Sequence, residues 1–304
     1  MESILHLFDL MPFVHAGHVN KRSFLSKLQF NGASWETLET PTGGVSLLFN
    51  QLYNVVGHGD VVVCSDRNPT IKKEMCPGYK GNREHRNDIQ VDKASAEYIL
   101  QKCQVPLFAQ TGYEADDIIY TIIKSCYNNY DKIYVYTGDS DLYFLVDDKV
   151  SIKPSSSRAK EITRENYETA IYKDGCIYNT CTFLKILYGD TSDCIPKLPS
   201  EVAQEMIRRC GIPALVRDLG KYTVVKNLFD HIYPQYSYQV DTVFPLIVPE
   251  TPTEFTQPDI DMIRNFGAAI KNKYFAGRMS PNFNVEPFVE DMCSKGIYLL
   301  KEGY

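Results

Sequence analysis

Hydrophobic positions in the first half of the chain alternate between short runs and longer helical patterns. The short runs are rich in β-branched and aromatic residues, as buried strands are. They lie at 4–8, 61–64, 106–109 and 132–137, with a last short run at 150–152. Between them, apolar residues recur at helical spacing in the segments 45–56, 92–103 and 114–127. This alternation predicts an α/β fold with a mostly parallel central sheet flanked by helices on both faces.

The strand pattern ends soon after residue 152, and the second half of the chain is predicted to be mostly helical. A Pro-rich stretch at 243–258 interrupts the helical pattern and is predicted to be a connector. No internal repeat or low-complexity tract is present. The predicted helices of this half are 163–172, 179–188, 200–210, 221–232, 259–272 and 285–293.

Composition excludes several classes of protein. The chain has 304 residues, of which 44% are hydrophobic and 23% charged, so neither disorder nor a fibrous repeat is expected. No apolar run reaches the ~18–20 residues of a membrane helix, and an acid at position 9 interrupts the apolar N-terminus. The nine cysteines include no CxxC pair, which predicts free buried thiols and no zinc site. We therefore expect a cytoplasmic protein.

Acidic residues gather directly after the predicted strands and at the ends of predicted helices. In an open α/β sheet these positions border the ligand site. One such acid alone often caps a helix or begins a turn. Many acids on one rim would repel unless cations lay among them, and oxygen ligands select Mg²⁺ or Mn²⁺. The nine acids are Asp9, Asp66, Glu114, Asp116, Asp117, Asp139, Asp141, Asp190 and Asp193.

The net charge of −6 at first argues against a nucleic-acid partner, because phosphate binding usually needs a surplus of Lys and Arg. The nine clustered acids change this picture. Without them, 29 of the 38 acids remain against 32 basic residues, so the rest of the chain has a surplus of three positive charges. Net charge therefore does not exclude a polyanionic substrate.

Five motifs carry a resemblance to a known family. Asp9 ends the first strand, and the segment 66–83 (DRNPTIKKEMCPGYKGNR) is similar to the family pattern D-x₃-T-x-R-x₄-P-x-Y-K-x-x-R. GYEADDII, TGDSDLYFLV and GDTSDCIP follow at 112–119, 137–146 and 189–196, in family order. The chain resembles the 5′ nucleases over roughly residues 4–200. This family includes phage flap endonucleases (5′→3′ exonucleases), phage-type ribonuclease H and the 5′ nuclease domain of bacterial DNA polymerase I.

The resemblance implies a PIN-like fold and a phosphodiesterase that uses two Mg²⁺ or Mn²⁺ ions. Two ions about 4 Å apart can activate a water and stabilise the leaving oxygen of an in-line displacement. Asp117 and Asp190 are expected as shared or outer ligands. The first ion is expected on Asp9, Asp66, Glu114 and Asp116, and the second on Asp139, Asp141 and Asp193.

The resemblance also implies a helical arch, at about 68–104, through which a single-stranded 5′ end passes. Lys80 and Arg83 are expected to reach the scissile phosphate as catalytic groups. A solvated charged loop is the alternative for this basic stretch, and Tyr79 is as consistent with a core tyrosine as with base stacking. The expected nucleic-acid contacts of the arch are Lys72, Lys73, Tyr79 and Arg86.

The chain departs from the family after its last aspartate. Relatives carry a glycine-rich hairpin there that grips duplex phosphates, often with a monovalent cation, whereas 195–201 holds two prolines and no glycine. We expect an atypical helix-hairpin-helix-like segment at about 186–215, with little K⁺ dependence and with Lys197, Arg208 and Arg209 supplying charge. The expected domains are a nuclease core, 1–178, and a helical duplex-binding portion with a C-terminal helical extension, 179–304.

Together these features predict a Mg²⁺-dependent, structure-specific 5′ nuclease that acts on DNA flaps or ends, or on RNA–DNA primers, in replication or repair. The alternatives are a PIN-like endoribonuclease and a catalytically silent nucleic-acid-binding protein. We expect a monomer in the cytoplasm of a bacterial or phage-infected cell, with replication proteins as further partners. The full set of acids favours the active enzyme over the silent protein.

Overall fold

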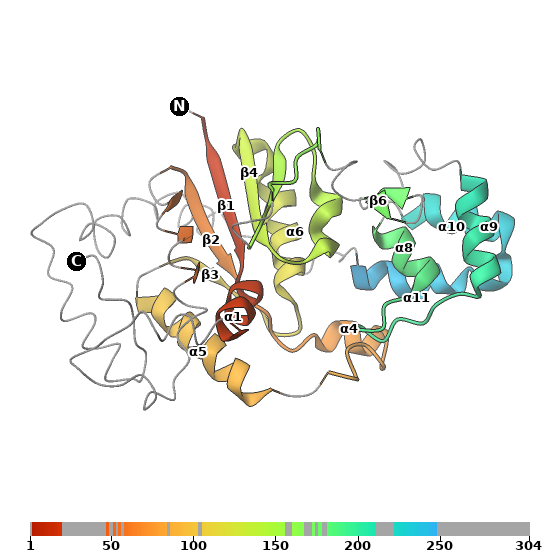
Figure 1. Ribbon diagram of the computed structural model, residues 1–304, viewed down its shortest axis with the longest axis horizontal. Helices are drawn as coiled ribbons and strands as arrows, with labels where there is room; N and C mark the ends of the chain where they lie inside the picture. Colours follow the sequence, from red (N-terminus) through yellow and green to blue (C-terminus); the bar gives the residue numbers. More distant parts are fainter. Residues whose placement is uncertain are drawn as a thin grey trace, which may run out of the picture.

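Five parallel strands form the central sheet, in the order β3-β2-β1-β4-β5 (Figure 1). The strands are β1 (Ile4–Asp9), β2 (Asp60–Cys64), β3 (Leu107–Phe108), β4 (Lys132–Thr137) and β5 (Val150–Pro154). All five predicted strands and the parallel arrangement are confirmed. The computed structural model describes residues 2–19, 47–48, 51–52, 54–55, 58–83, 86–102, 105–155, 160–166, 172–173, 176–177, 181–210 and 222–247.

Successive side chains of a strand point to opposite faces of the sheet, and in these strands the side chains on both faces are mostly apolar. Helices therefore cover both faces. Leu5 and Leu7 pack against α6 (Ala115–Cys126) on one face. Phe8 packs on the other face, where its ring stacks on Tyr136 at 4.1 Å. That second face is covered by α1 (Leu10–Val19) and α5 (Asn87–Lys102).

The described helices between residues 181 and 247 form a separate apolar cluster beside the sheet, on the right of Figure 1. Leu187, Met206, Phe229 and Val240 are fully buried within it. The segment after β2 joins this cluster through Tyr79, and the short helix α4 contacts α11. These helices are α4 (Thr70–Met75), α8 (Cys181–Tyr188), α9 (Ser200–Cys210), α10 (Tyr222–Ile232) and α11 (Tyr238–Ile247).

Two sequence predictions are wrong. The predicted helix 163–172 is wrong at both ends: residues 164–166 form a turn, and Tyr172 lies in β6 (Tyr172–Lys173). Strand β6 pairs antiparallel with β7 (Cys176–Ile177), and the Asp-Gly dipeptide between them is of a kind that favours hairpins. The predicted connector at 243–258 begins inside α11, which continues to Ile247. Helix α1 was not anticipated. The predicted helices 259–272 and 285–293 lie outside the described residues.

Among the described residues, Cys64 and Cys126 are buried free thiols, whereas the free thiols of Cys76 and Cys194 are only half-buried. Within the same residues, no helix combines the length and the apolar character needed to cross a membrane. The division of the chain near residue 178 stays a prediction.

Candidate active site

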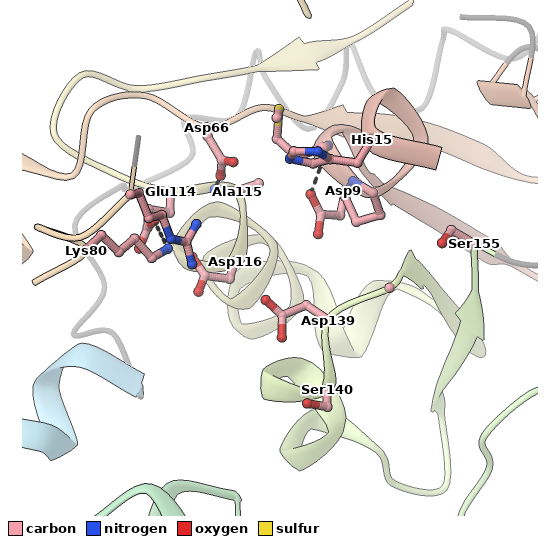
Figure 2. Close-up of a pocket in the computed structure, with 14 residues that line it drawn as sticks. Asp9, His15, Asp66, Lys80, Glu114, Ala115, Asp116, Asp139, Ser140 and Ser155 are labelled. Carbon is pink, nitrogen blue, oxygen red and sulfur yellow. Dashed lines mark hydrogen bonds and ion pairs between the residues drawn. The ribbon is translucent and has the colours of Figure 1, made fainter. Parts of the chain in front are cut away.

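The acids of the sheet converge because parallel strands bring their carboxyl ends to one edge. Asp9 ends β1, Asp66 follows β2 by two residues and Asp139 follows β4 by two. Figure 2 shows their carboxylates facing the same space as Asp116 at the start of α6. This inner hollow measures about 520 Å³. Its acidic lining residues are Asp9, Asp66, Glu114, Asp116 and Asp139.

Thr137 links two of these acids. Its buried hydroxyl donates to Oδ2 of Asp9 at 2.9 Å and accepts from the backbone N–H of Asp139 at 3.0 Å. Burial and the neighbouring Asp66 raise the pKa of Asp9 well above its ordinary value. Thr137 is not among the predicted site residues, although its place at the end of a strand and at the start of TGDSD was a usable signal.

Backbone N–H groups at the start of α6 hold the side chains of Asp66, Glu114 and Asp117. Asp66 accepts from the N–H of Ala115 at 2.7 Å, and Asp117 accepts from the N–H of Glu114 at 2.9 Å. Glu114 and Asp117 thereby form a capping box. Asp117 is buried and does not line the hollow, and burial together with Asp116 raises its pKa to about 7. Asp117 therefore helps to fix the start of α6, and its expected role as a shared or outer metal ligand stays a prediction.

Lys72 and Tyr79 lie inside the protein, which corrects their expected role in nucleic-acid binding. Nζ of Lys72 is 2.8 Å from Glu114 and 2.9 Å from Asp117, and the Tyr79 hydroxyl donates to Glu114 at 2.8 Å. Both residues are only 3% exposed. Burial would raise the pKa of Glu114, but Lys72 and Lys80 outweigh it and hold this pKa at about 2. Of the two alternatives for Tyr79, the core tyrosine is the correct one.

A second acidic group lies where the α8–α9 hairpin meets the segment after β4. One oxygen from each of Asp141, Asp190 and Asp193 lies within 4.8 Å of the others, and we call these three acids the outer group. The same spacing holds for Glu114, Asp116 and Asp117, the inner group. The outer group lines a hollow of its own, the outer hollow. Asp116 and Asp139 line both this hollow and the inner one, so the two groups border one groove.

Lys185 of α8 contacts the whole outer group, and the sequence analysis missed it. Its Nζ pairs with Asp141 and lies 2.7 Å from Asp190. Burial and Asp139 raise the pKa of Asp141 to about 6. Hydrogen bonds from Lys185 and Ser192 outweigh burial and lower the pKa of Asp190 to about 2. A lysine in the last turn of the helix that leads into GDTSD was the available signal.

Lys80 and Arg83 lie between the two groups. Lys80 pairs with Glu114, and Arg83 lies 2.7 Å from Asp193. Both line the inner and outer hollows and a third hollow of about 840 Å³. This third hollow is predominantly basic, so the groove changes from negative to positive along its length. Its basic lining residues are His15, Arg67, Lys73, Lys80, Arg83, Arg86 and Lys93.

The remaining expected nucleic-acid contacts are solvent-exposed or outside the described side chains. Lys73, Arg86 and Lys197 are exposed. Arg208 is exposed but is held by Glu205 on the same helix at 2.6 and 2.7 Å. Arg209 lies near the end of α9, and its side chain is outside the described part of the chain.

The α8–α9 hairpin uses its one glycine for its own close packing. Gly189 has φ +65°, and a Cβ there would lie 2.4 Å from the carbonyl oxygen of Ile195. Asp190 and Ile195 pair antiparallel, and the buried Gln239 of α11 donates to the carbonyl of Pro196. The hairpin is thus closed on itself and supported by α11.

The donor set of the groove suits a hard divalent cation, because every candidate ligand is a carboxylate oxygen. Each acidic group also pairs with a buried or half-buried ammonium, Lys72 in the inner group and Lys185 in the outer group. These ion pairs show that both groups require positive charge. The residues present therefore fit Mg²⁺ or Mn²⁺ as ligands.

Comparison with known proteins identifies relatives of this chain by sequence. Residues 17–172 match the family described as "5'-3' exonuclease, N-terminal resolvase-like domain". The chain is 33% identical over 135 residues to DNA polymerase I of Mycobacterium leprae, covering 43% of this chain but only 14% of that protein. It is 22% identical over 217 residues to the 5'-3' exonuclease of Buchnera aphidicola, covering 69% of this chain and 70% of that protein.

Solved structures agree on the fold. The flap endonuclease of bacteriophage T5, in a pseudo-enzyme–product complex with DNA and metal ions, has a TM-score of 0.55 at 19% identity. The T5 5'-exonuclease with bound zinc has a TM-score of 0.54 at 20% identity. Each comparison covers 88% of this chain and 98% of the other. Because the family match covers half of its length, this chain belongs to the 5'-3' exonucleases, a family of nucleases.

Proposed function

We propose that this chain is a Mg²⁺-dependent, structure-specific 5′ nuclease that hydrolyses phosphodiester bonds at flaps or ends of DNA, or in RNA–DNA primers. One observation supports this most strongly: eight carboxylates from separate chain segments line one groove, with Lys80 and Arg83 between them. The complex of the T5 neighbour with DNA and metal ions agrees with this choice of substrate and cofactor.

Two divalent ions are proposed, one toward each end of the acidic part of the groove. The inner ion would be held by Asp9, Asp66, Glu114 and Asp116, and the outer ion by Asp139, Asp141, Asp190 and Asp193. When bound, such ions lower the pKa of a water nucleophile and neutralise the attacking and leaving oxygens.

The basic residues are proposed to act on the phosphate. Lys80 and Arg83 now pair with Glu114 and Asp193, both of them proposed metal ligands. When divalent ions neutralise those acids, the two side chains can turn to the scissile phosphate and stabilise its developing charge. Lys73 and Arg86, on the basic hollow, would bind the single strand, and Lys197 the duplex.

A cleavage assay with four 5′-labelled substrates tests the proposal: a flap, a nicked duplex, an RNA–DNA hybrid and single-stranded RNA. Each is incubated with Mg²⁺ and with EDTA, and Asp116→Asn serves as the inactive control. We expect Mg²⁺-dependent cuts near the flap junction or the 5′ end. Cleavage of the RNA alone would instead identify an endoribonuclease, and binding without cleavage in any arm would identify a silent binding protein.

We further propose a monomer that acts in the cytoplasm of a bacterial or phage-infected cell beside replication proteins. The bacterial polymerase relatives agree with this setting. Sedimentation of the purified chain with and without flap DNA tests the monomer.

A further inference from the structure

Lys185 lies at the centre of the outer group, and no step of the proposed function uses it. Its Nζ pairs with Oδ2 of Asp141 and lies 2.7 Å from Oδ2 of Asp190 and 3.6 Å from Oδ2 of Asp193. The three oxygens that face the ammonium therefore come from the same three acids that can jointly hold a metal ion. The lysine occupies the position that a metal ion would take.

An ammonium and a divalent ion cannot share this position. Mg²⁺ binds oxygen at about 2.0–2.1 Å, so an ion held by these carboxylates would lie within roughly 3 Å of the lysine nitrogen. Two positive charges at that separation repel strongly in a half-buried groove. Either the outer ion or the ammonium of Lys185 can occupy the group at one time.

The surroundings of Lys185 allow its ammonium to leave. Its side chain is 14% exposed, and those of Asp141 and Asp190 are each 20% exposed. The side chain of Lys72, which pairs with the inner group, is only 4% exposed. Because lysine carries its charge on a flexible four-carbon stem, the ammonium of Lys185 can move toward solvent while α8 stays in place.

We propose that Lys185 is the exchangeable counter-ion of the outer group. It offsets part of the negative charge of Asp141, Asp190 and Asp193 until a divalent ion arrives, so that binding of the outer ion is an exchange of ammonium for metal. This role rests on the proposed function, because it concerns a residue of the same site. The released ammonium needs a new anionic partner, and a phosphate of the bound strand supplies one. Loading of the outer ion should therefore be favoured by substrate.

Calorimetric titration of the EDTA-treated protein with Mn²⁺ tests the exchange without measuring activity. We expect the wild type to bind two ions, one tightly and one weakly. Lys185→Met should tighten the weak site by about tenfold, because the competing charge is gone, and leave the tight site unchanged. Lys226→Met is the matched control: Lys226 also pairs with an aspartate, Asp241 at 2.8 Å, but in the helical cluster. It should change neither site.

A weak site that is unchanged or weakened in Lys185→Met would overturn the proposal and make the lysine a structural support of the outer group. Lys185→Gln provides the same measurement if the methionine variant does not fold, and Lys185→Arg, which keeps the charge, should not tighten the site. If the wild type binds no Mn²⁺, both this role and the metal-dependent function fail. Two sites with unaltered affinities in Lys185→Met and Lys185→Gln refute the exchange alone.

Discussion

The inner and outer acidic groups reach similar spacing by different means. The inner group is built into the start of α6, where the capping box and the buried Lys72 fix its carboxylates. The outer group joins Asp141, which follows β4, to Asp190 and Asp193 of the α8–α9 hairpin, and Lys185 pairs with these acids. The inner group is thus part of the sheet core, whereas the outer group exists only where two packing units meet.

The largest expected difference between the groups is in cleavage. Asp116 lines both hollows, so Asp116→Ala should reduce the single-turnover rate by about 1,000-fold or more. Asp190→Ala, which removes one acid of the outer group, should reduce the single-turnover rate by about tenfold. Single-turnover kinetics on the 5′-labelled flap measure both. Equal reductions in rate for the two variants would show that the two groups contribute equally to cleavage.

Replacing Lys72 should destabilise the folded protein more than replacing Lys185. Lys72→Met leaves the buried Asp117 without its cation and leaves Glu114 paired with Lys80 alone, and should lower the free energy of unfolding by about 3–5 kcal/mol. Lys185→Met, in the more exposed outer group, should lower the free energy of unfolding by about 1 kcal/mol or less. Urea unfolding in EDTA provides both values. A larger loss for Lys185→Met would reverse the comparison.

The pH dependence of stability should also divide between the groups. Burial raises the pKa of Asp117 to about 7 and that of Asp141 to about 6, above the value near 3.9 in unfolded chains. The folded protein therefore binds extra protons between about pH 4 and 7, and its stability falls as pH rises through this range. In EDTA, the melting temperature should rise by several degrees from pH 8 to pH 5.

Below about pH 4 the trend should reverse. Glu114 and Asp190 have pKa values of about 2 in the folded protein, so the stability they contribute is lost as they become protonated. Asp117→Asn should flatten the upper part of the curve, near pH 7, and Asp141→Asn the part near pH 6. A melting temperature that is constant from pH 5 to pH 8 would contradict both raised values.

The smallest expected effect concerns the hairpin that carries half of the outer group. Because two prolines remove backbone donors and the one glycine serves internal packing, duplex binding should rely on side-chain charge. Lys197→Ala in an Asp116→Asn background should weaken duplex binding about threefold and flatten its salt dependence. Fluorescence anisotropy in NaCl and in KCl measures this. Tightening specific to K⁺ would show that the hairpin backbone still grips phosphate.

The sequence alone determined the sheet and most of the inner site. Short runs rich in β-branched and aromatic residues specified the strands, and the acids after them had to meet because the carboxyl ends of parallel strands share one edge. Local patterns predict the wrong element where strand pairing competes with the helix that the residues themselves favour. Sequence favoured a helix at 163–172, although a short β-hairpin near its end decided otherwise.

Only the tertiary structure decided which charges reach the groove and which are buried. Lys72 and Lys73 are neighbours with the same side chain, yet Lys72 is buried against Glu114 and Asp117 while Lys73 is exposed. Lys185 and Asp141 are 44 positions apart and meet only because α8 packs beside the segment after β4. Local patterns place a residue on an element, but ion pairs between distant elements depend on how those elements pack, and no short-range pattern encodes that.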